Sequence, residues 1–187
     1  MAAFLQGEFL LAANSLRDQN FYRTVVLVLE HNDEGAMGLV VNRPSSIAVD
    51  AALGGGSSMP LDAPVYIGGP VETSALFVLH NHVGAGLQDR EVVPGLFLAG
   101  SDDSLQEVVN PGGESPANGI FRVYCGYAGW GAEQLEDEIS RGDWLSVPAD
   151  SGTVLEEDPY GIWHVCTRRF RRAHRLLPHN VRNPDWN

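Results

Sequence analysis

The sequence has 187 residues, of which 44% are hydrophobic and 19% charged, and its 12 basic and 24 acidic side chains give a formal net charge of −12. All the basic residues are arginines. Six lie in residues 168–187 opposite one aspartate, a net charge of +5, and residues 1–167 carry six arginines against 23 acidic residues, −17. This excludes an acidic body that binds nucleic acid through its own field, and the absence of lysine excludes a Walker-type phosphate lysine or a Schiff base.

The clearest pattern along the chain is a β-hairpin. Residues 24–30 (TVVLVLE) and 36–41 (AMGLVV) are short apolar runs rich in β-branched residues, and the turn-forming HNDEG segment joins them. Because both runs are apolar almost throughout, we expect two central strands that are covered on both faces.

Other short apolar runs bounded by glycine, proline or asparagine predict more strands and helices. Further strands are predicted at residues 64–67, 75–80, 91–93, 95–99, 120–124 and 144–147. Helices are predicted at 47–53 with Ser45 or Ser46 as N-cap, from Ser104 to about residue 110, at 134–140, and from Asp158 to about Leu177. The glycine-rich segment 126–131 (GYAGWG) is predicted to be a tight turn between a strand and the helix at 134–140.

The last helix has an apolar stripe formed by Ile162, Cys166, Phe170, Ala173 and Leu177, and its arginines lie off that stripe. Strands and helices mix without strict alternation. We therefore predict one α+β domain on a mixed, curved sheet.

The composition also suggests a compartment. No run approaches the roughly 18 apolar residues that a membrane span needs. Residues 1–15 lack the basic leader that is typical of a signal peptide. Cys125 and Cys166 have neither a CxxC spacing nor metal-ligand neighbours, which argues against a disulfide or a metal site. We expect a cytoplasmic protein with no membrane span, no disulfide and no cofactor.

Two histidine groups raise the question of catalysis or metal binding. The HNDEG segment reads more simply as a polar turn than as a base, but the alternative is a hydrolase-like or metal-assisted enzyme that uses His31 with Glu30 or Glu136. His80 and His82 lie two residues apart, as metal ligands on a strand can, but an exposed strand end is the favoured interpretation, so we predict no metal site.

The arginine-rich end allows three interpretations. It could bind nucleic acid, anionic lipid or an acidic partner, or its cationic face could be solvated or lie on the acidic body, which we favour. No helix-turn-helix pattern precedes it, so we expect no sequence-specific DNA binding.

Several blocks together resemble the YqgE/AlgH family. They are FYRTVVLVLEHNDEGAMGLVVNRP at 21–44, VYIGGPV at 65–71, FVLH at 77–80 and GYAGWGAEQLEDEI at 126–139, and the resemblance extends from about Gly7 to Trp163. It implies an α+β fold with the sheet bent into a pseudo-barrel flanked by helices. It thus divides the chain into residues 1–163, which are AlgH-like, and an arginine-rich helix and tail at 164–187, expected to pack on the same domain. The chain departs from the family pattern at Asn14 and Glu133, where proline and glycine are usual.

What the resemblance implies about activity is limited. The family often carries the label of transcriptional regulator, and it implies no catalytic role for any signature residue. We predict a non-enzymatic regulatory or binding protein whose partner is a small molecule or a protein. We place its functional surface where four turns would meet: HNDEG at 31–35, NRP at 42–44, GGPV at 68–71 and GYAGW at 126–130. Tyr127 and Trp130 would line a pocket there, with Arg43 as its charged anchor. The candidate binding residues are His31, Asn32, Asn42, Arg43, Gly68, Gly69, Pro70, Tyr127, Trp130, Gln134 and Glu136.

Overall fold

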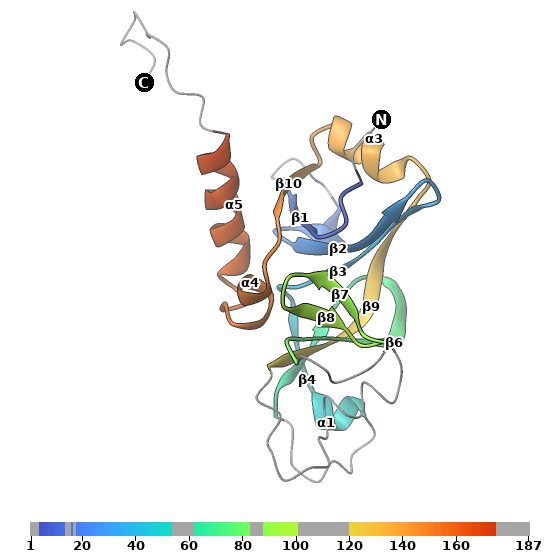
Figure 1. Ribbon diagram of the computed structural model, residues 1–187, viewed down its shortest axis with the longest axis vertical. Coiled ribbons are helices and arrows are strands. Elements are labelled where there is room, and N and C mark those ends of the chain that lie inside the picture. The colour runs from blue at the N-terminus through green and yellow to red at the C-terminus, as the bar shows by residue number, and fades with distance from the viewer. Residues whose placement is uncertain are drawn as a thin grey trace, which may run out of the picture.

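Figure 1 shows the computed structural model of the chain, which describes residues 4–13, 16, 18–53, 62–82, 88–100 and 120–174. The strands are β1 (Glu8–Ala12), β2 (Val25–Asn32), β3 (Gly35–Val40), β4 (Pro44–Ala48), β5 (Pro64–Ile67), β6 (Val71–His80), β7 (Arg90–Val93), β8 (Leu96–Leu98), β9 (Phe121–Gly131) and β10 (Trp144–Pro148). The helices are the 3₁₀ helix η1 (Gln19–Phe21), α1 (Val49–Ala52), α3 (Gln134–Ser140), α4 (Ser151–Leu155) and α5 (Ile162–Ala173). The helix expected from Ser104 lies outside the described residues.

The strands form one curled sheet, a half-barrel, which confirms the predicted α+β class. Its main path runs β10-β1-β2-β3-β9-β6-β8-β7, and β4 and β5 branch from it through β9. All pairs are antiparallel except β5 with β9. Strand β9 therefore occupies the middle, where it pairs with β3, β5 and β6.

The predicted hairpin is confirmed as β2 and β3, and β2 is buried on both faces. Leu27 and Leu29 pack into a large apolar cluster around Tyr124, whereas Val26 and Val28 face a second cluster on the other side. Neighbouring side chains of a strand point to opposite faces, so a continuous apolar run is what a doubly covered strand requires.

Three short elements differ from the prediction. Residues 47–48 continue strand β4, which pairs with β5, so α1 begins only at Val49 and has no serine N-cap. Strand β1 was not predicted; it lies between β2 and β10. The GYAGWG segment is the second half of β9 rather than a turn, and the turn itself follows at residues 132–133.

The predicted helix at 158–177 begins later than expected. Asp150 caps α4 through the Thr153 amide at 2.8 Å, and a turn with a 2.8 Å bond from the Gly161 amide to the Asp158 carbonyl precedes α5. Residues after 174 lie outside the described part of the chain.

The helices cover different ends of the sheet. Helix α5 packs on β10, β1 and β2, whereas α3 packs on β9, β3 and β10 at the end near the N-terminus and α1 lies at the opposite end (Figure 1). The predicted stripe on α5 is confirmed at Ile162 and Cys166, which are buried, and at Phe170, which packs against the core. Ala173 is exposed, and Leu177 lies outside the described residues. In the described segments, no helix has the length and apolar character that crossing a bilayer requires.

Candidate functional site

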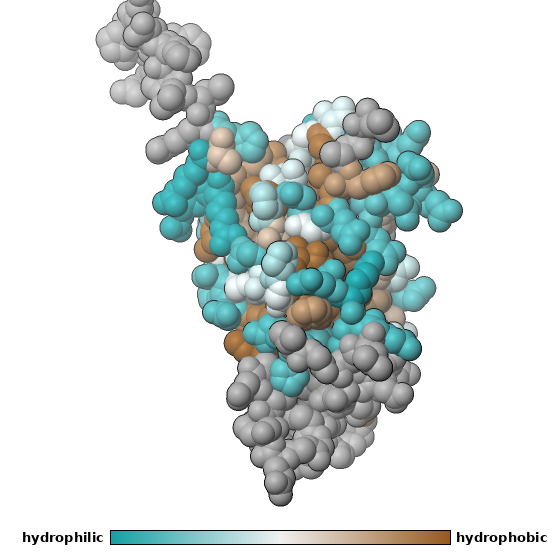
Figure 2. Space-filling model, in the orientation of Figure 1, coloured by the Kyte–Doolittle hydropathy of each residue, from teal (hydrophilic) through white to brown (hydrophobic). Residues whose placement is uncertain are grey.

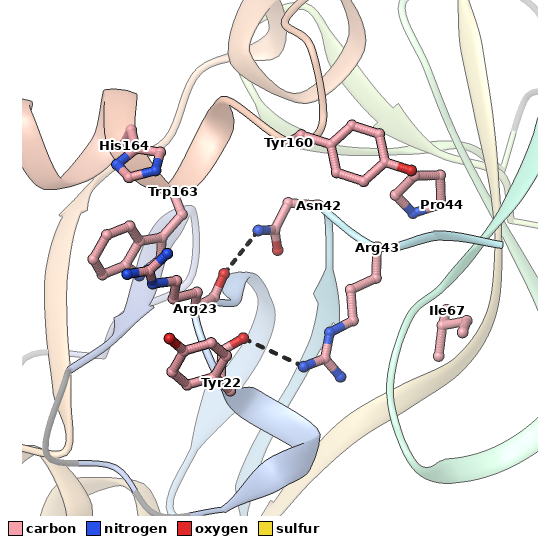
Figure 3. A pocket seen from close by; sticks show the side chains of 9 residues that line it. All are labelled: Tyr22, Arg23, Asn42, Arg43, Pro44, Ile67, Tyr160, Trp163 and His164. Carbon is pink, nitrogen blue, oxygen red and sulfur yellow. Dashed lines mark hydrogen bonds between the residues drawn. The ribbon is translucent and has the colours of Figure 1, made fainter.

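A groove of about 360 Å³ lies between the segment that follows β3 and the beginning of α5 (Figure 3). We call it the Arg43 groove. Its lining residues are Tyr22, Arg23, Asn42, Arg43, Pro44, Ile67, Tyr160, Trp163 and His164. Segments from four parts of the sequence therefore form one surface.

Asn42 fastens the floor of the groove. Its side-chain oxygen accepts a hydrogen bond from the Val25 amide at 2.9 Å, and its amide nitrogen donates to the Arg23 carbonyl at 2.9 Å. Arg23 has a left-handed backbone with φ of 51°, a conformation uncommon for residues other than glycine. The asparagine thus holds the chain just before β2 in an unusual turn.

Arg43 lies across the groove and binds backbone. Its guanidinium donates to the Asn20 carbonyl and, at 3.4 Å each, to the Gln19 and Tyr22 carbonyls around η1. Partial burial lowers the pKa of Arg43 from its ordinary value, and Asp18 opposes that shift. A guanidinium has five N–H donors, so it keeps capacity for an acceptor supplied by a ligand.

A second cavity of about 330 Å³ shares Arg43 and Ile67 with the groove. Gly69 and Pro70 also line it. The Asn42–Arg43 turn and the Gly68–Gly69–Pro70 turn, which the sequence analysis placed on one surface, therefore meet at Arg43.

Aromatic rings and arginines alternate along the groove. Tyr22 is 61% exposed and Tyr160 is 76% exposed, although both are large apolar rings. The Arg23 guanidinium carbon lies 5.4 Å from the ring centres of both Tyr22 and Trp163, within the range of a cation–π contact. Trp163 is fixed by a 3.2 Å hydrogen bond to the Ala12 carbonyl.

Tyr127 and Trp130 do not line either of these cavities. Tyr127 packs edge-on against Phe77, with ring centres 6.0 Å apart, at the border of the large core cluster. Trp130 is 7% exposed and belongs to the second cluster. The predicted pocket of Tyr127, Trp130 and Arg43 is therefore replaced by one in which Arg43 meets Tyr22, Tyr160 and Trp163.

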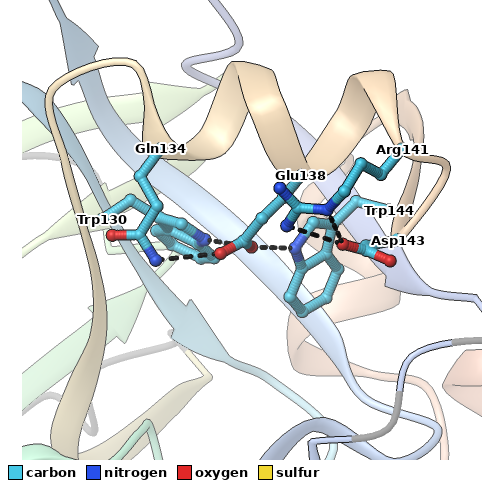
Figure 4. Close-up of polar contacts among 6 residues, drawn as sticks. All are labelled: Trp130, Gln134, Glu138, Arg141, Asp143 and Trp144. Carbon is cyan, nitrogen blue, oxygen red and sulfur yellow. Dashed lines mark hydrogen bonds and ion pairs between the residues drawn. The ribbon is translucent and has the colours of Figure 1, made fainter.

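Trp130 belongs instead to an acidic clamp on α3, which Figure 4 shows. One carboxylate oxygen of Glu138 accepts hydrogen bonds from the indole of Trp130 at 2.9 Å and from that of Trp144 at 2.7 Å. The other oxygen accepts from Gln134 at 2.9 Å. The clamp satisfies two buried indole donors and joins β9, α3 and β10.

His31 and Glu136 meet, as the enzymatic alternative required. The imidazole Nε2 lies 2.9 Å from a Glu136 oxygen, and Nδ1 accepts a 3.1 Å hydrogen bond from the Leu5 amide. The bond from Leu5 leaves Nδ1 without a proton, so Nε2 is the donor to Glu136. The side chain is 1% exposed and both ring nitrogens are occupied, so the pair ties the N-terminal segment to α3.

Neither of the other residues expected near His31 joins a site with it. Glu30 points away and forms a 2.7 Å ion pair with Arg90. Asn32 accepts from the Glu34 amide at 2.8 Å, which is the turn chemistry favoured for HNDEG.

The glycines of the GGP and GYAGW segments allow two backbones to cross. Gly126 has φ of 68°, and a side chain there would meet the Gly69 carbonyl oxygen at 2.6 Å. At Gly68, a Cβ would lie 2.2 Å from the Gly126 carbonyl oxygen. Only glycine fits this crossing, which explains these signature residues through packing.

The two histidines near the end of β6 do not act as a metal pair. His80 is buried; its Nδ1 accepts from the His82 amide at 3.2 Å, and its Nε2 lies 3.3 Å from an Asp89 oxygen. Burial lowers the pKa of His80, and Asp89 opposes that shift. Among the described residues, no group of three or more His, Cys, Asp or Glu side chains could hold a metal ion.

Of the nine residues that line the groove, only Asn42 and Arg43 are among the candidate binding residues predicted from the sequence. Of the other seven, Pro44 and Trp163 are half-buried, and five are exposed: Tyr22, Arg23, Ile67, Tyr160 and His164. Their signal is exposure of large side chains, and exposure depends on how four distant segments meet. The one local signal is Asp158–Pro159, which predicts the start of a helix next to Tyr160.

Comparisons with known proteins agree on one family. The pattern described as AlgH-like matches residues 9–174. The chain is 34% identical to a UPF0301 protein of Chlorobaculum parvum, covering 97% of this chain and 95% of that protein, and 41% identical to a UPF0301 protein of Cupriavidus metallidurans, covering 92% and 88%. The solution structure of the AlgH protein from Pseudomonas aeruginosa matches with a TM-score of 0.74 and 32% identity, covering 94% and 93% of the two chains. A crystal structure from Corynebacterium diphtheriae has the same fold, with a TM-score of 0.70, 23% identity and coverage of 90% and 88%.

Proposed function

The chain belongs to the AlgH-like family, and we propose that it is a non-enzymatic regulatory protein that binds a partner in the Arg43 groove. The observation that carries this proposal is the gathering of exposed apolar rings beside two arginines. Three of the six large hydrophobic side chains exposed in the described residues, those of Tyr22, Ile67 and Tyr160, line this one groove.

The composition of the groove supports binding rather than chemistry. Tyrosine, tryptophan and arginine are the residues that most often dominate binding energy, and Trp163, Arg23 and Arg43 are held by contacts within the protein before any ligand arrives. A prearranged surface loses less side-chain entropy on binding. The groove includes His164 but no carboxylate, cysteine or serine that could work with it as a nucleophile.

The experiment is a thermal-shift screen of metabolites, nucleotides and short peptides on the full chain. A ligand at about 100 times its Kd adds about 2.7 kcal/mol of stability, which raises Tm by roughly 5–11 °C for a chain of this size. We expect the variant Tyr160→Ala to abolish the shift, because Tyr160 lines the groove. Its side chain is exposed, so its loss leaves the core intact. Ile47→Ala is the matched control, since Ile47 is also an exposed apolar residue but lies outside the groove.

Two results would overturn the proposal. One is a set of ligands that stabilise Tyr160→Ala as strongly as the unaltered protein. The other is turnover of a substrate that depends on the His31–Glu136 pair, tested with His31→Gln.

We also place this function in the cytoplasm. Both cysteines, Cys125 and Cys166, are free thiols, as is usual in a reducing compartment. Localisation of a tagged full chain by cell fractionation tests this, and recovery in the periplasmic or secreted fraction would contradict it.

A further inference from the structure

Helix α5 carries a row of arginines that point away from the sheet. Arg168, Arg171 and Arg172 are exposed, and Arg171 and Arg172 lie three and four residues after Arg168, which places both beside it on the helix surface. Figure 2 shows hydrophilic side chains along the outer side of this helix. We call these three residues the α5 arginine row.

The described part of the acidic body does not neutralise this row. Arg169, the neighbouring arginine, pairs with Asp150, but among the described residues no acidic side chain forms an ion pair with Arg168, Arg171 or Arg172. Within the part of the chain that the structure describes, these three charges on the outer side of α5 therefore have no acidic partner.

The arginine row continues directly from the Arg43 groove. Trp163 and His164, in the first turn of α5, line the groove, and Arg168 lies one turn beyond His164 on the same side. At about 1.5 Å per residue, Trp163 to Arg172 spans about 14 Å, which an extended segment of about five residues covers. An apolar groove thus leads into a short cationic track.

We propose that the groove and the α5 arginine row together bind a polypeptide segment that has an aromatic or large apolar anchor followed by several acidic residues. This inference rests on the proposed function and names the partner. The anchor occupies the groove beside Tyr160 and Trp163, and the carboxylates pair with the row.

Charge sets the direction of the bound segment. Glu156, Glu157 and Asp158 lie between α4 and α5, before the end of α5 that is away from the row. They repel acidic residues placed there, whereas Arg171 and Arg172 attract them at the other end of α5. The acidic part therefore runs toward the C-terminal end of α5.

The size of the cationic area favours a polypeptide over nucleic acid or a membrane. Residues 1–167 carry a net charge of −17, so a long polyanion or an anionic bilayer meets net repulsion beyond α5 and the groove. A short acidic segment contacts the row alone.

The test uses three fluorescein-labelled peptides of about ten residues. The first has tryptophan followed by four glutamates, the second replaces the glutamates with glutamines, and the third replaces the tryptophan with alanine. Binding to the full chain is measured by fluorescence anisotropy at about 50 and 200 mM salt, where screening distinguishes charge pairing from apolar contact.

Two protein variants, used beside Tyr160→Ala, complete the test. The triple variant Arg168→Gln, Arg171→Gln and Arg172→Gln removes the row with a residue of similar helix propensity. Arg141→Gln, at the C-cap of α3, is the arginine control, since Arg141 is exposed but lies on another element. Circular dichroism checks the helix content of the triple variant, because cations in the last turn also stabilise a helix.

We expect the glutamate peptide to bind at least about tenfold more tightly than the glutamine peptide at low salt, a difference of about 1.4 kcal/mol. The difference should disappear in the triple variant and shrink at high salt, and Arg141→Gln should bind as the unaltered protein does. Loss of the tryptophan should weaken binding in every protein except Tyr160→Ala.

Each other outcome overturns the inference, and the outcomes separate it from the proposed function. If the glutamate and glutamine peptides bind equally but Tyr160→Ala weakens the binding of both, the groove binds partners. In that case the proposal that the partner has acidic residues is wrong. If no peptide binds, the inference fails, and the ligand screen decides the groove on its own. If single-stranded oligonucleotide or phosphatidylserine vesicles bind through the row and the acidic peptide does not, the partner class is wrong.

Discussion

Replacing Glu138 tests whether the clamp on the two indoles holds the α3 end of the sheet together. In Glu138→Ala the indole donors of Trp130 and Trp144, which are 7% and 3% exposed, lose their acceptor. A buried donor left unpaired costs about 1–3 kcal/mol. We therefore expect a loss of about 3 kcal/mol for the two, equivalent to a fall in Tm of about 6–12 °C for a chain of this size.

Glu138→Gln separates the acceptor from the charge. Both indoles donate to the same carboxylate oxygen, so one amide oxygen can replace it. Hydrogen bonds to a charged acceptor are stronger than those to a neutral one, so glutamine should cost about 1–2 kcal/mol. The glutamine variant is expected to lie between the unaltered protein and Glu138→Ala.

The assay is urea unfolding followed by circular dichroism, with tryptophan fluorescence as a local probe of the two indoles. Asp137→Ala is the control, because Asp137 is exposed on the same helix and removing a first-turn carboxylate costs only about 0.5 kcal/mol. A loss below about 1 kcal/mol in Glu138→Ala would show that water replaces the carboxylate, because an unsatisfied buried donor costs at least that much, and the reasoning would fail.

Three further predictions follow from packing and titration. In Gly126→Ala the new Cβ would lie 2.6 Å from the Gly69 oxygen, so we expect the free energy of unfolding to fall by more than about 2 kcal/mol. Gly142→Ala is the control: it has a similar φ of 78° but open space around it, and it should cost about 1 kcal/mol. Equal costs in urea unfolding would contradict the close crossing of the two backbones. Because burial lowers the pKa of His80, the unfolded chain binds its proton more readily and stability should fall as pH drops below about 6.5; His80→Gln should flatten the curve between pH 7 and 5, and an unchanged slope would refute this. Burial opposes ionisation of Asp150, but hydrogen bonds from Arg169 and Thr153 lower its pKa overall, so its contribution should be present above about pH 4 and lost as pH falls further; unfolding of Asp150→Asn at pH 3–6 should lack that acid-side loss, and a curve parallel to the unaltered protein would count against it.

The sequence predicted elements well where local pattern decides them. The β2–β3 hairpin, β5, α3 and the apolar stripe of α5 follow from runs of fixed period and from capping or turn residues. It failed at β9, because glycines at 126, 129 and 131 are typical of turns, whereas here they let β9 continue past β5 and β6. Only the approaching backbone at Gly69 distinguishes the two cases.

The site was predicted in part for the same reason. Arg43, Asn42, Gly69 and Pro70 stand out locally and do meet. Tyr160, by contrast, acquires its exposure from a turn between α4 and α5, and α4 itself was not predicted. A groove made by segments about 20, 43, 67 and 160 residues along the chain cannot be read from any one of them.

The central place of β9 has a consequence for synthesis on the ribosome. Strand β3 ends at Val40, and its neighbour β9 is complete only at Gly131. Strand β1 pairs with β10, which is synthesised still later. Translation adds about 5–20 residues per second, so β3 is paired with β2 but lacks β9 for roughly 5–18 s. During that interval β3 has an unpaired, apolar edge that can pair with another chain, so synthesis is the stage at which this sheet is most exposed to aggregation.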